Sequence, residues 1–144
     1  MTRYEQMLQE ASEASGVEIR LASDRVAELM VEDTIVLVKP LDATEESVSI
    51  FTVILDGAVD DKVLRKAMEL NLFGRGTDGG IIGLFVDSLV YSRDLSLEGV
   101  SADAFGEALV SFARKSREIA SDLSSGDAPS NPQPPLPMGS EILV

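Results

Sequence analysis

The sequence predicts an α+β domain in which an antiparallel sheet of about five strands packs with three helices, in the order α-β-β-β-α-β-β-α. Three observations support this class. Apolar residues recur at helical spacing in three segments and gather in short β-type runs in between. Consecutive strands are mostly separated by turn-length spacers, which can join only antiparallel neighbours. The chain of 144 residues fits one domain, which we expect to span residues 1–123 and to be followed by a flexible tail, 124–144.

The first helix is predicted to begin at a capping box formed by Thr2 and Glu5. Its apolar positions recur at i, i+3 and i+4 spacing, and Gly16 is suited to end it. The segment that follows, to Asp24, is predicted to be a connector. Alternating apolar residues within it could form a short extended piece. The helix stripe consists of Tyr4, Met7, Leu8, Ala11 and Ala14, and the alternating residues are Val17, Ile19 and Leu21.

Three strands are predicted next, over Val26–Val31, Thr34–Lys39 and Ser47–Leu55. The second and third are apolar on both faces, although a sheet covered by helices on one face should alternate with polar residues. Three helices of modest length cannot cover both faces. We therefore expect the surplus apolar surface to meet a second copy or another protein.

The second helix is predicted to be capped by Asp60 or Asp61, and Ser101 is predicted to cap the last one. Between them lie a glycine-rich loop and a hairpin of Ile81–Val86 and Ser88–Arg93. The loop matches the letters of the GxGxxG pattern, but it follows a helix and precedes a strand. Pyrophosphate binding needs the reverse order, so the glycines are interpreted as architectural. The last helix has a core-facing stripe of Phe105, Ala108, Leu109, Phe112, Ile119, Ala120 and Leu123.

Composition excludes several classes of function. The chain has no Cys and no His, which removes the commonest general base and the commonest zinc ligands. The net charge of −13 disfavours nucleic acid as a partner, and no apolar run approaches the ~20 residues that span a bilayer. The basic cluster Arg114-Lys115-Arg117 is interpreted as a solvated helix face. We expect no enzymatic activity, no cofactor, no metal site and no membrane contact.

The tail from Ser124 contains five prolines between Pro129 and Pro137 and is predicted to be flexible. Its closing Glu-Ile-Leu-Val is either an exposed end without a role or a short docking motif.

Several of these segments resemble the class I type III secretion chaperones, over roughly Tyr4 to Leu123. The matching features are Asn71-Leu72-Phe73-Gly74, the Gly79-Gly80 pair, Leu84, and Leu89-Val90-Tyr91-Ser92-Arg93. The resemblance implies a bacterial cytoplasmic homodimer that binds the N-terminal segment of a secreted effector in extended form and keeps it soluble and export-competent. It also implies a possible partner in the secretion-system ATPase. The alternative is a regulatory or assembly adaptor with the same fold, because fold does not fix function.

Two sets of interface residues are predicted. For effector binding we expect strand addition along Val26–Val31, taken as the free edge of the sheet, with apolar residues of the first helix beside it; a plain core role is the alternative for that helix. For the dimer, the resemblance places the contact on the second helix and the strand after the loop, where the apolar surplus lies. The effector-binding candidates are Met7, Leu8, Ala11, Ala27, Leu29 and Val31, and the dimer candidates are Leu70, Leu72, Phe73, Ile81, Ile82 and Leu84.

Overall fold

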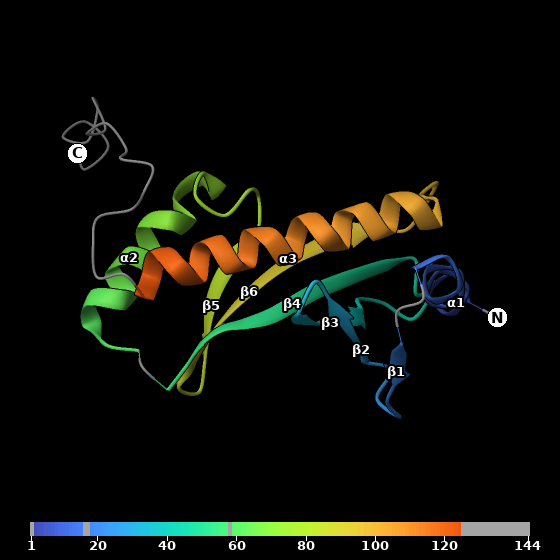
Figure 1. The fold of residues 1–144 in the computed structure, drawn as a ribbon, viewed down its shortest axis with the longest axis horizontal. Helices are drawn as coiled ribbons and strands as arrows, with labels where there is room; N and C mark the ends of the chain where they lie inside the picture. Colours follow the sequence, from blue (N-terminus) through green and yellow to red (C-terminus); the bar gives the residue numbers. More distant parts are fainter. Residues whose placement is uncertain (1, 16–17, 58, 125–144) are drawn as a thin grey trace.

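The computed structural model describes residues 2–15, 18–57 and 59–124, and these form three helices and six strands with one short 3₁₀ turn (Figure 1). Gly16, expected to end the first helix, and the tail from residue 125 onward lie outside the described residues. The elements are α1 (Arg3–Ser15), β1 (Ile19–Leu21), β2 (Ala27–Val31), β3 (Thr34–Pro40), β4 (Ser47–Asp56), α2 (Asp61–Asn71), η1 (Leu72–Gly74), β5 (Ile81–Phe85), β6 (Ser88–Ser96) and α3 (Ala102–Ser124).

All strand pairs of the sheet are antiparallel, and the strand order is β1-β2-β3-β4-β6-β5. The α+β class and the succession of helices and strands are therefore confirmed. The additional strand is β1, which forms in the segment where alternation allowed a short extended piece. It pairs with β2 through Ile19 opposite Leu29 and Leu21 opposite Ala27. Val26–Val31 is consequently not a free edge, and that prediction is corrected.

The three helices and one face of the sheet enclose the core. Figure 1 shows α3 running along the sheet, with α1 at one end and α2 at the other. Phe112 of α3 stacks on Tyr91 of β6, with 4.6 Å between ring centroids and 7° between ring planes. Val36, Val38 and Ile50 on the same face of the sheet are fully buried. Nearly all of the predicted α3 stripe belongs to this core.

The predicted helix starts are present. The Thr2 amide donates to Glu5 Oε1 at 3.0 Å and the Glu5 amide donates to Thr2 Oγ1 at 3.2 Å, which is the reciprocal pattern of a capping box. Asp60, rather than Asp61, caps α2 by accepting from the Val63 amide at 2.9 Å. Ser101 Oγ accepts from the Ala104 amide at 3.1 Å and caps α3. Each cap satisfies an amide that has no partner within the helix.

The opposite face of the sheet carries exposed apolar side chains. Because successive residues of a strand point to opposite faces, the alternation that buries one set on the core presents the other outward. The side chains of Met30, Ile35, Val53, Ile81 and Phe85 are between 49% and 71% exposed. The doubly apolar strands predicted from sequence are thus covered by helices on one face, in agreement with the expected surplus.

The glycine-rich loop connects α2 to β5, and close packing and turn geometry explain its glycines. A Cβ at Gly76 would lie 2.5 Å from Leu70 Cδ2, and one at Gly80 would lie 2.6 Å from the Ser92 carbonyl oxygen. Gly74 and Gly79 have positive φ angles of 67° and 83°, which glycine adopts without steric cost. The loop sets the path of the chain from α2 to β5, in agreement with the architectural role interpreted from its position after a helix and before a strand.

Asn71, the last residue of α2, occupies the outer edge of β5. Its side-chain amide donates to the Ile82 carbonyl and accepts from the Ile82 amide, both at 2.7 Å. These are the two backbone groups that a further strand would need at this position. The side chain therefore satisfies part of an edge that would otherwise be open to pairing, one of the ways in which proteins protect sheet edges.

Replacing Asn71 with Ala should destabilise the protein by about 1–3 kcal/mol, because two half-buried backbone groups of Ile82 lose their partners. Urea unfolding at one fixed protein concentration measures the change. Glu69→Ala, at an exposed position of the same helix, is the matched control. Equal stability of the two variants would contradict this role of Asn71.

Candidate functional site

A groove lies between α1, the β1–β2 edge of the sheet and the first half of α3. We call it the α1–α3 groove. Its volume is about 340 Å³ and its walls are mainly apolar. The lining residues are Ala11, Ala14, Ile19, Leu29, Val31, Ala102, Asp103, Gly106, Glu107, Leu109 and Val110.

The edge strand β1 presents backbone groups beside this groove. The Ala22 amide donates to the Val26 carbonyl at 3.0 Å, which makes these two residues a hydrogen-bonded pair. Pairs alternate along an antiparallel ladder, so Arg20 and Glu28 form the next bonded pair, and the amides and carbonyls of Ile19 and Leu21 point away from β2. In the described part of the chain no strand pairs with β1 on that side. This edge can accept an extended segment.

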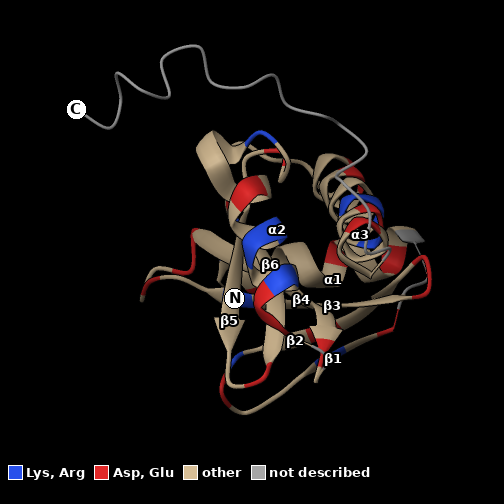
Figure 2. Ribbon diagram, turned by 90° about the vertical axis from the view of Figure 1, so that its left-hand side faces the viewer, with Lys and Arg blue, Asp and Glu red and all other residues tan. Residues whose placement is uncertain are grey.

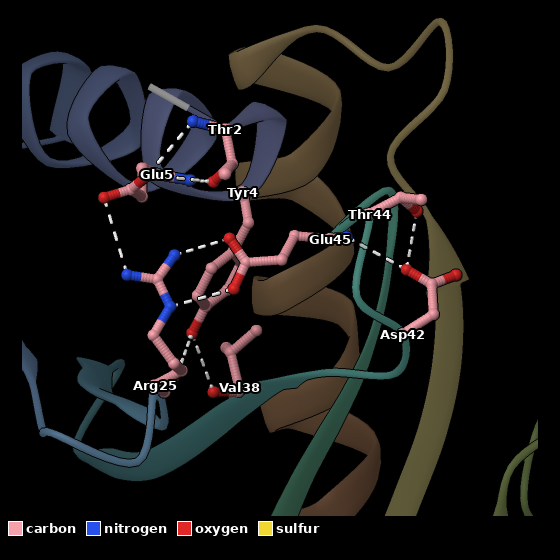
Figure 3. A network of polar contacts seen from close by, with 8 residues as sticks. All are labelled: Thr2, Tyr4, Glu5, Arg25, Val38, Asp42, Thr44 and Glu45. Carbon is pink, nitrogen blue, oxygen red and sulfur yellow. Dashed lines mark hydrogen bonds and ion pairs between the residues drawn. The ribbon is translucent and has the colours of Figure 1, made fainter.

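A network of polar contacts fastens α1 to the β1–β2 turn and to the β3–β4 loop (Figure 3). Arg25, which adopts a positive φ of 71°, makes a two-pronged contact with Glu45 at 2.8 and 2.5 Å and reaches Glu5 at 3.5 Å. We call these three residues the Arg25 clasp. The hydrogen bond from Arg25 lowers the pKa of Glu45, and hydrogen bonds from Thr2 lower that of Glu5. The carboxylates in turn raise the pKa of Arg25, so all three groups stay charged at neutral pH.

The Tyr4 hydroxyl lies beneath this clasp. It donates toward the carbonyl oxygens of Arg25 at 2.7 Å and Val38 at 3.0 Å. Burial raises the pKa of Tyr4 to about 12, which keeps the phenol protonated and able to donate. The clasp and Tyr4 together hold α1, one wall of the groove, against the sheet.

The predicted effector-binding residues fall into two groups. Met7, Leu8 and Ala27 are buried in the core, at 0–5% exposure, and face no open surface. Ala11, Leu29 and Val31 are also buried, but they line the α1–α3 groove. Sequence reasoning missed the α3 wall of this groove, because spacing along one helix cannot show which other helix will lie beside it.

The predicted dimer residues also divide. Leu70 and Ile82 are in the core, whereas Leu72, Phe73, Ile81 and Leu84 are exposed. The structure adds two strongly exposed apolar residues at the β5–β6 turn, Phe85 and Val86. The whole apolar run of Ile81–Val86 was the sequence signal for them.

Charged residues elsewhere form ion pairs that join elements of the fold. Figure 2 shows acidic residues on helices and loops around the molecule and basic residues prominent on α2 and α3. Arg114 and Arg117 of α3 both contact Glu32 in the β2–β3 turn, at 3.0 and 3.2 Å. The two arginines of the basic cluster therefore fasten α3 to a turn, whereas Lys115 pairs with Glu118 of the same helix at 3.3 Å. Across the described ranges, no three acidic, His or Cys side chains are grouped so that they could hold a metal ion. No described helix has the length and hydrophobicity needed to cross a membrane.

The Arg25 clasp predicts a pH-dependent stability. A carboxyl group whose pKa is lowered in the folded protein stabilises the fold at pH values above its ordinary pKa of 4.5. This contribution is lost as the pH falls through the pKa of the folded state. The free energy of unfolding should therefore decrease on acidification below about pH 4.5.

Glu45→Gln should be less stable than the wild type at neutral pH, and the difference between their free energies of unfolding should narrow as the pH falls. Urea unfolding across this range tests the effect. Glu46→Gln, at the exposed neighbouring position, is the control, and equal behaviour of both variants would contradict the clasp.

Comparison with known proteins supports the same fold. The model of the Tir chaperone protein (CesT) family matches residues 6–120. No curated protein sequence is similar enough to count as a match. Among solved structures, the fold is similar to the ExsC–ExsE complex, with a TM-score of 0.70 and 12% identity over 88% of this chain and 100% of that chain.

Two further solved structures share the fold. The Yersinia pestis type III secretion chaperone SycH, solved with a stable fragment of YscM2, has a TM-score of 0.59 and 18% identity over 78% of this chain and 96% of its own. YbjN from E. coli, a putative transcription regulator, has a TM-score of 0.58 and 14% identity over 81% and 87%. At these identities the structural likenesses establish the fold alone. The family match covers most of the chain, and this protein belongs to the Tir chaperone (CesT) family.

Proposed function

We propose that this protein is a type III secretion chaperone that binds the N-terminal segment of an effector in extended form and keeps it soluble and competent for secretion. The observation that carries the proposal is the family match over residues 6–120, which takes in almost all of the described fold. The proposed role needs no catalytic residue, cofactor or metal. It places the protein in the bacterial cytoplasm, with the secretion-system ATPase as a further candidate partner.

The β1 edge is the proposed site of strand addition. The outward amides and carbonyls of Ile19 and Leu21 would bond to the effector backbone, while effector side chains enter apolar recesses beside the strand. The opposite edge is less suited, because Asn71 already holds the backbone of Ile82. The proposed effector contact therefore lies on β1, which pairs with β2, and not on β2, where it was predicted from the sequence.

The exposed apolar surface at the other end of the sheet is the proposed dimer contact. Leu72 and Phe73 follow α2, and Ile81 and Phe85 lie on the outward side of β5. A surface of this kind closes by meeting its own copy across a two-fold axis. The dimer leaves the β1 edges of both copies free, so each can bind an effector segment.

A regulatory or assembly adaptor with the same fold is the alternative, supported by the likeness of the fold to YbjN, a putative transcription regulator. Identifying the protein that co-purifies from the native host separates the two. A secreted protein held through its N-terminal region supports the chaperone. A transcription factor or an envelope component supports the adaptor.

Leu21→Pro should weaken effector binding about tenfold or more, because proline removes one outward donor of β1 without breaking a bond to β2. Leu21→Ala is the matched control, since it loses the same side chain but keeps the amide. Affinity for the co-purified effector fragment is measured by isothermal titration calorimetry, with circular dichroism of each variant. Equal losses for the two folded variants would contradict strand addition at β1.

Ile81→Asp should convert the proposed dimer to a monomer, because a charge placed in an apolar interface is desolvated without a partner. Light scattering after size exclusion distinguishes the dimer from the 15.4 kDa monomer. Leu41→Asp places the same charge on an exposed apolar residue of the β3–β4 loop, and this control should remain dimeric. A wild-type protein that is monomeric at micromolar concentration would overturn the dimer proposal.

A further inference from the structure

Small residues keep the α1–α3 groove open. Ala11 and Ala14 form its α1 wall, and Ala102 and Gly106 belong to its α3 wall. Gly106 is the fifth residue of a helix of 23 residues, and glycine is among the least favourable residues in a helix. A Cβ at this position would meet nothing within 4 Å. No tight contact explains the glycine, and the space beside it is open.

The volume of the groove suits side chains rather than a folded element. Its volume of about 340 Å³ lies at the lower end of the ~300–1,000 Å³ range of ligand pockets. Ile19, Leu29 and Val110 contribute branched aliphatic surface to it. The groove adjoins β1, because Ile19 belongs to both. An extended chain added at this edge could place an aliphatic side chain inside.

Two carboxylates of α3 lie at the groove. Asp103 and Glu107 are exposed and belong to its lining, which contains no basic residue. They are four positions apart, a spacing that brings like charges together on a helix and destabilises it. Neither side chain forms an ion pair or hydrogen bond within the described structure. The helix N-terminus accounts for an acidic residue at Asp103, in the first turn, but not for Glu107.

We propose that the α1–α3 groove selects effector segments in which a large aliphatic residue is accompanied, two positions away, by Lys or Arg. The aliphatic side chain fills the groove and the cation pairs with Asp103 and Glu107. Residues two positions apart on an extended chain point to the same side and lie ~6.8 Å apart, so a cation at that spacing faces the same groove lining as the aliphatic side chain. This selectivity rests on the proposed function and specifies which effector sequences that function accepts.

Charge argues for a basic effector segment over the other candidate occupants. The tail of this chain, residues 125–144, contains Asp127 and Glu141 and no Lys or Arg. Its closing Glu-Ile-Leu-Val would bring an acidic residue to an acidic rim. A second copy is disfavoured as the occupant of this groove, because a chain with a net charge of −13 would meet an acidic rim and the proposed dimer contact lies at the other end of the sheet.

The test is selection from a random dodecapeptide library displayed on phage, using the full-length protein. The wild type should enrich peptides with Leu, Ile or Met and a Lys or Arg two positions away. The double variant D103K/E107K should enrich Asp or Glu at that second position instead. Such an exchange of preference requires direct pairing, and a general loss of folding could not produce it.

Filling the groove provides the second arm. Gly106→Leu should reduce recovery of the wild-type peptides about tenfold or more. Ala104→Leu is the matched control, because Ala104 is exposed on the same helix and does not line the groove. This control should retain the wild-type recovery. Equal recovery by both folded variants would overturn the inference.

The remaining outcomes of these experiments also decide between the inference and its alternatives. An unchanged basic preference in D103K/E107K, or no enriched peptide while the native effector still co-purifies, would overturn the inference and leave the proposed function standing. Enrichment of peptides ending in Glu-Ile-Leu-Val would assign the groove to the tail. Loss of the wild-type dimer in Gly106→Leu would assign it to a second copy. Absence of any co-purified effector would instead count against the proposed function.

Discussion

Phe112 of α3 lies flat on Tyr91 of β6 at the centre of the core, and the packing of this one long helix along the sheet sets the other features of the molecule. With α1 and α2 at its ends, α3 covers a single face, so the apolar side chains that alternate to the other face stay exposed. Tyr91 also links the helix to the loop, because its hydroxyl donates to the Thr77 carbonyl at 2.6 Å. The same helix supplies one wall of the α1–α3 groove. The exposed apolar surface and the groove both follow from one packing arrangement.

The two edges of the sheet differ, and this difference directs the functional proposal. At the β5 edge Asn71 holds both backbone groups of Ile82, and exposed apolar residues lie around it. At the β1 edge the backbone of Ile19 and Leu21 points outward beside a groove with an acidic rim. Main-chain pairing suits the second edge, since hydrogen bonds give affinity for many sequences while recesses discriminate among them. Side-chain packing suits the first. The proposed dimer, with an effector site on each copy, would use both edges.

Much of the fold could be predicted because its signals are local. The caps at Thr2 and Ser101, the α3 stripe and the hairpin after the glycine loop each depend on residues close in sequence. The position of β1 could not be settled in this way, because three residues carry little periodicity and their pairing with β2 depends on tertiary context. Because β1 was not predicted as a strand, the free edge of the sheet was placed at Val26–Val31, and the candidate effector-binding residues were placed beside it. The groove could not be predicted from the sequence, since it exists only where α1 and α3 meet. The open space beside Gly106 likewise depends on the folded structure.

Hydrogen–deuterium exchange of the free protein and of its complex with the co-purified effector fragment tests most directly whether the client adds to β1. If the client adds to β1, the amides of Ile19 and Leu21, which face away from β2, should become strongly protected in the complex. The amide of Ile82, already bonded to Asn71, should exchange equally in both states. Protection confined to β5, or a stable complex with unchanged exchange at Ile19 and Leu21, would contradict strand addition at β1.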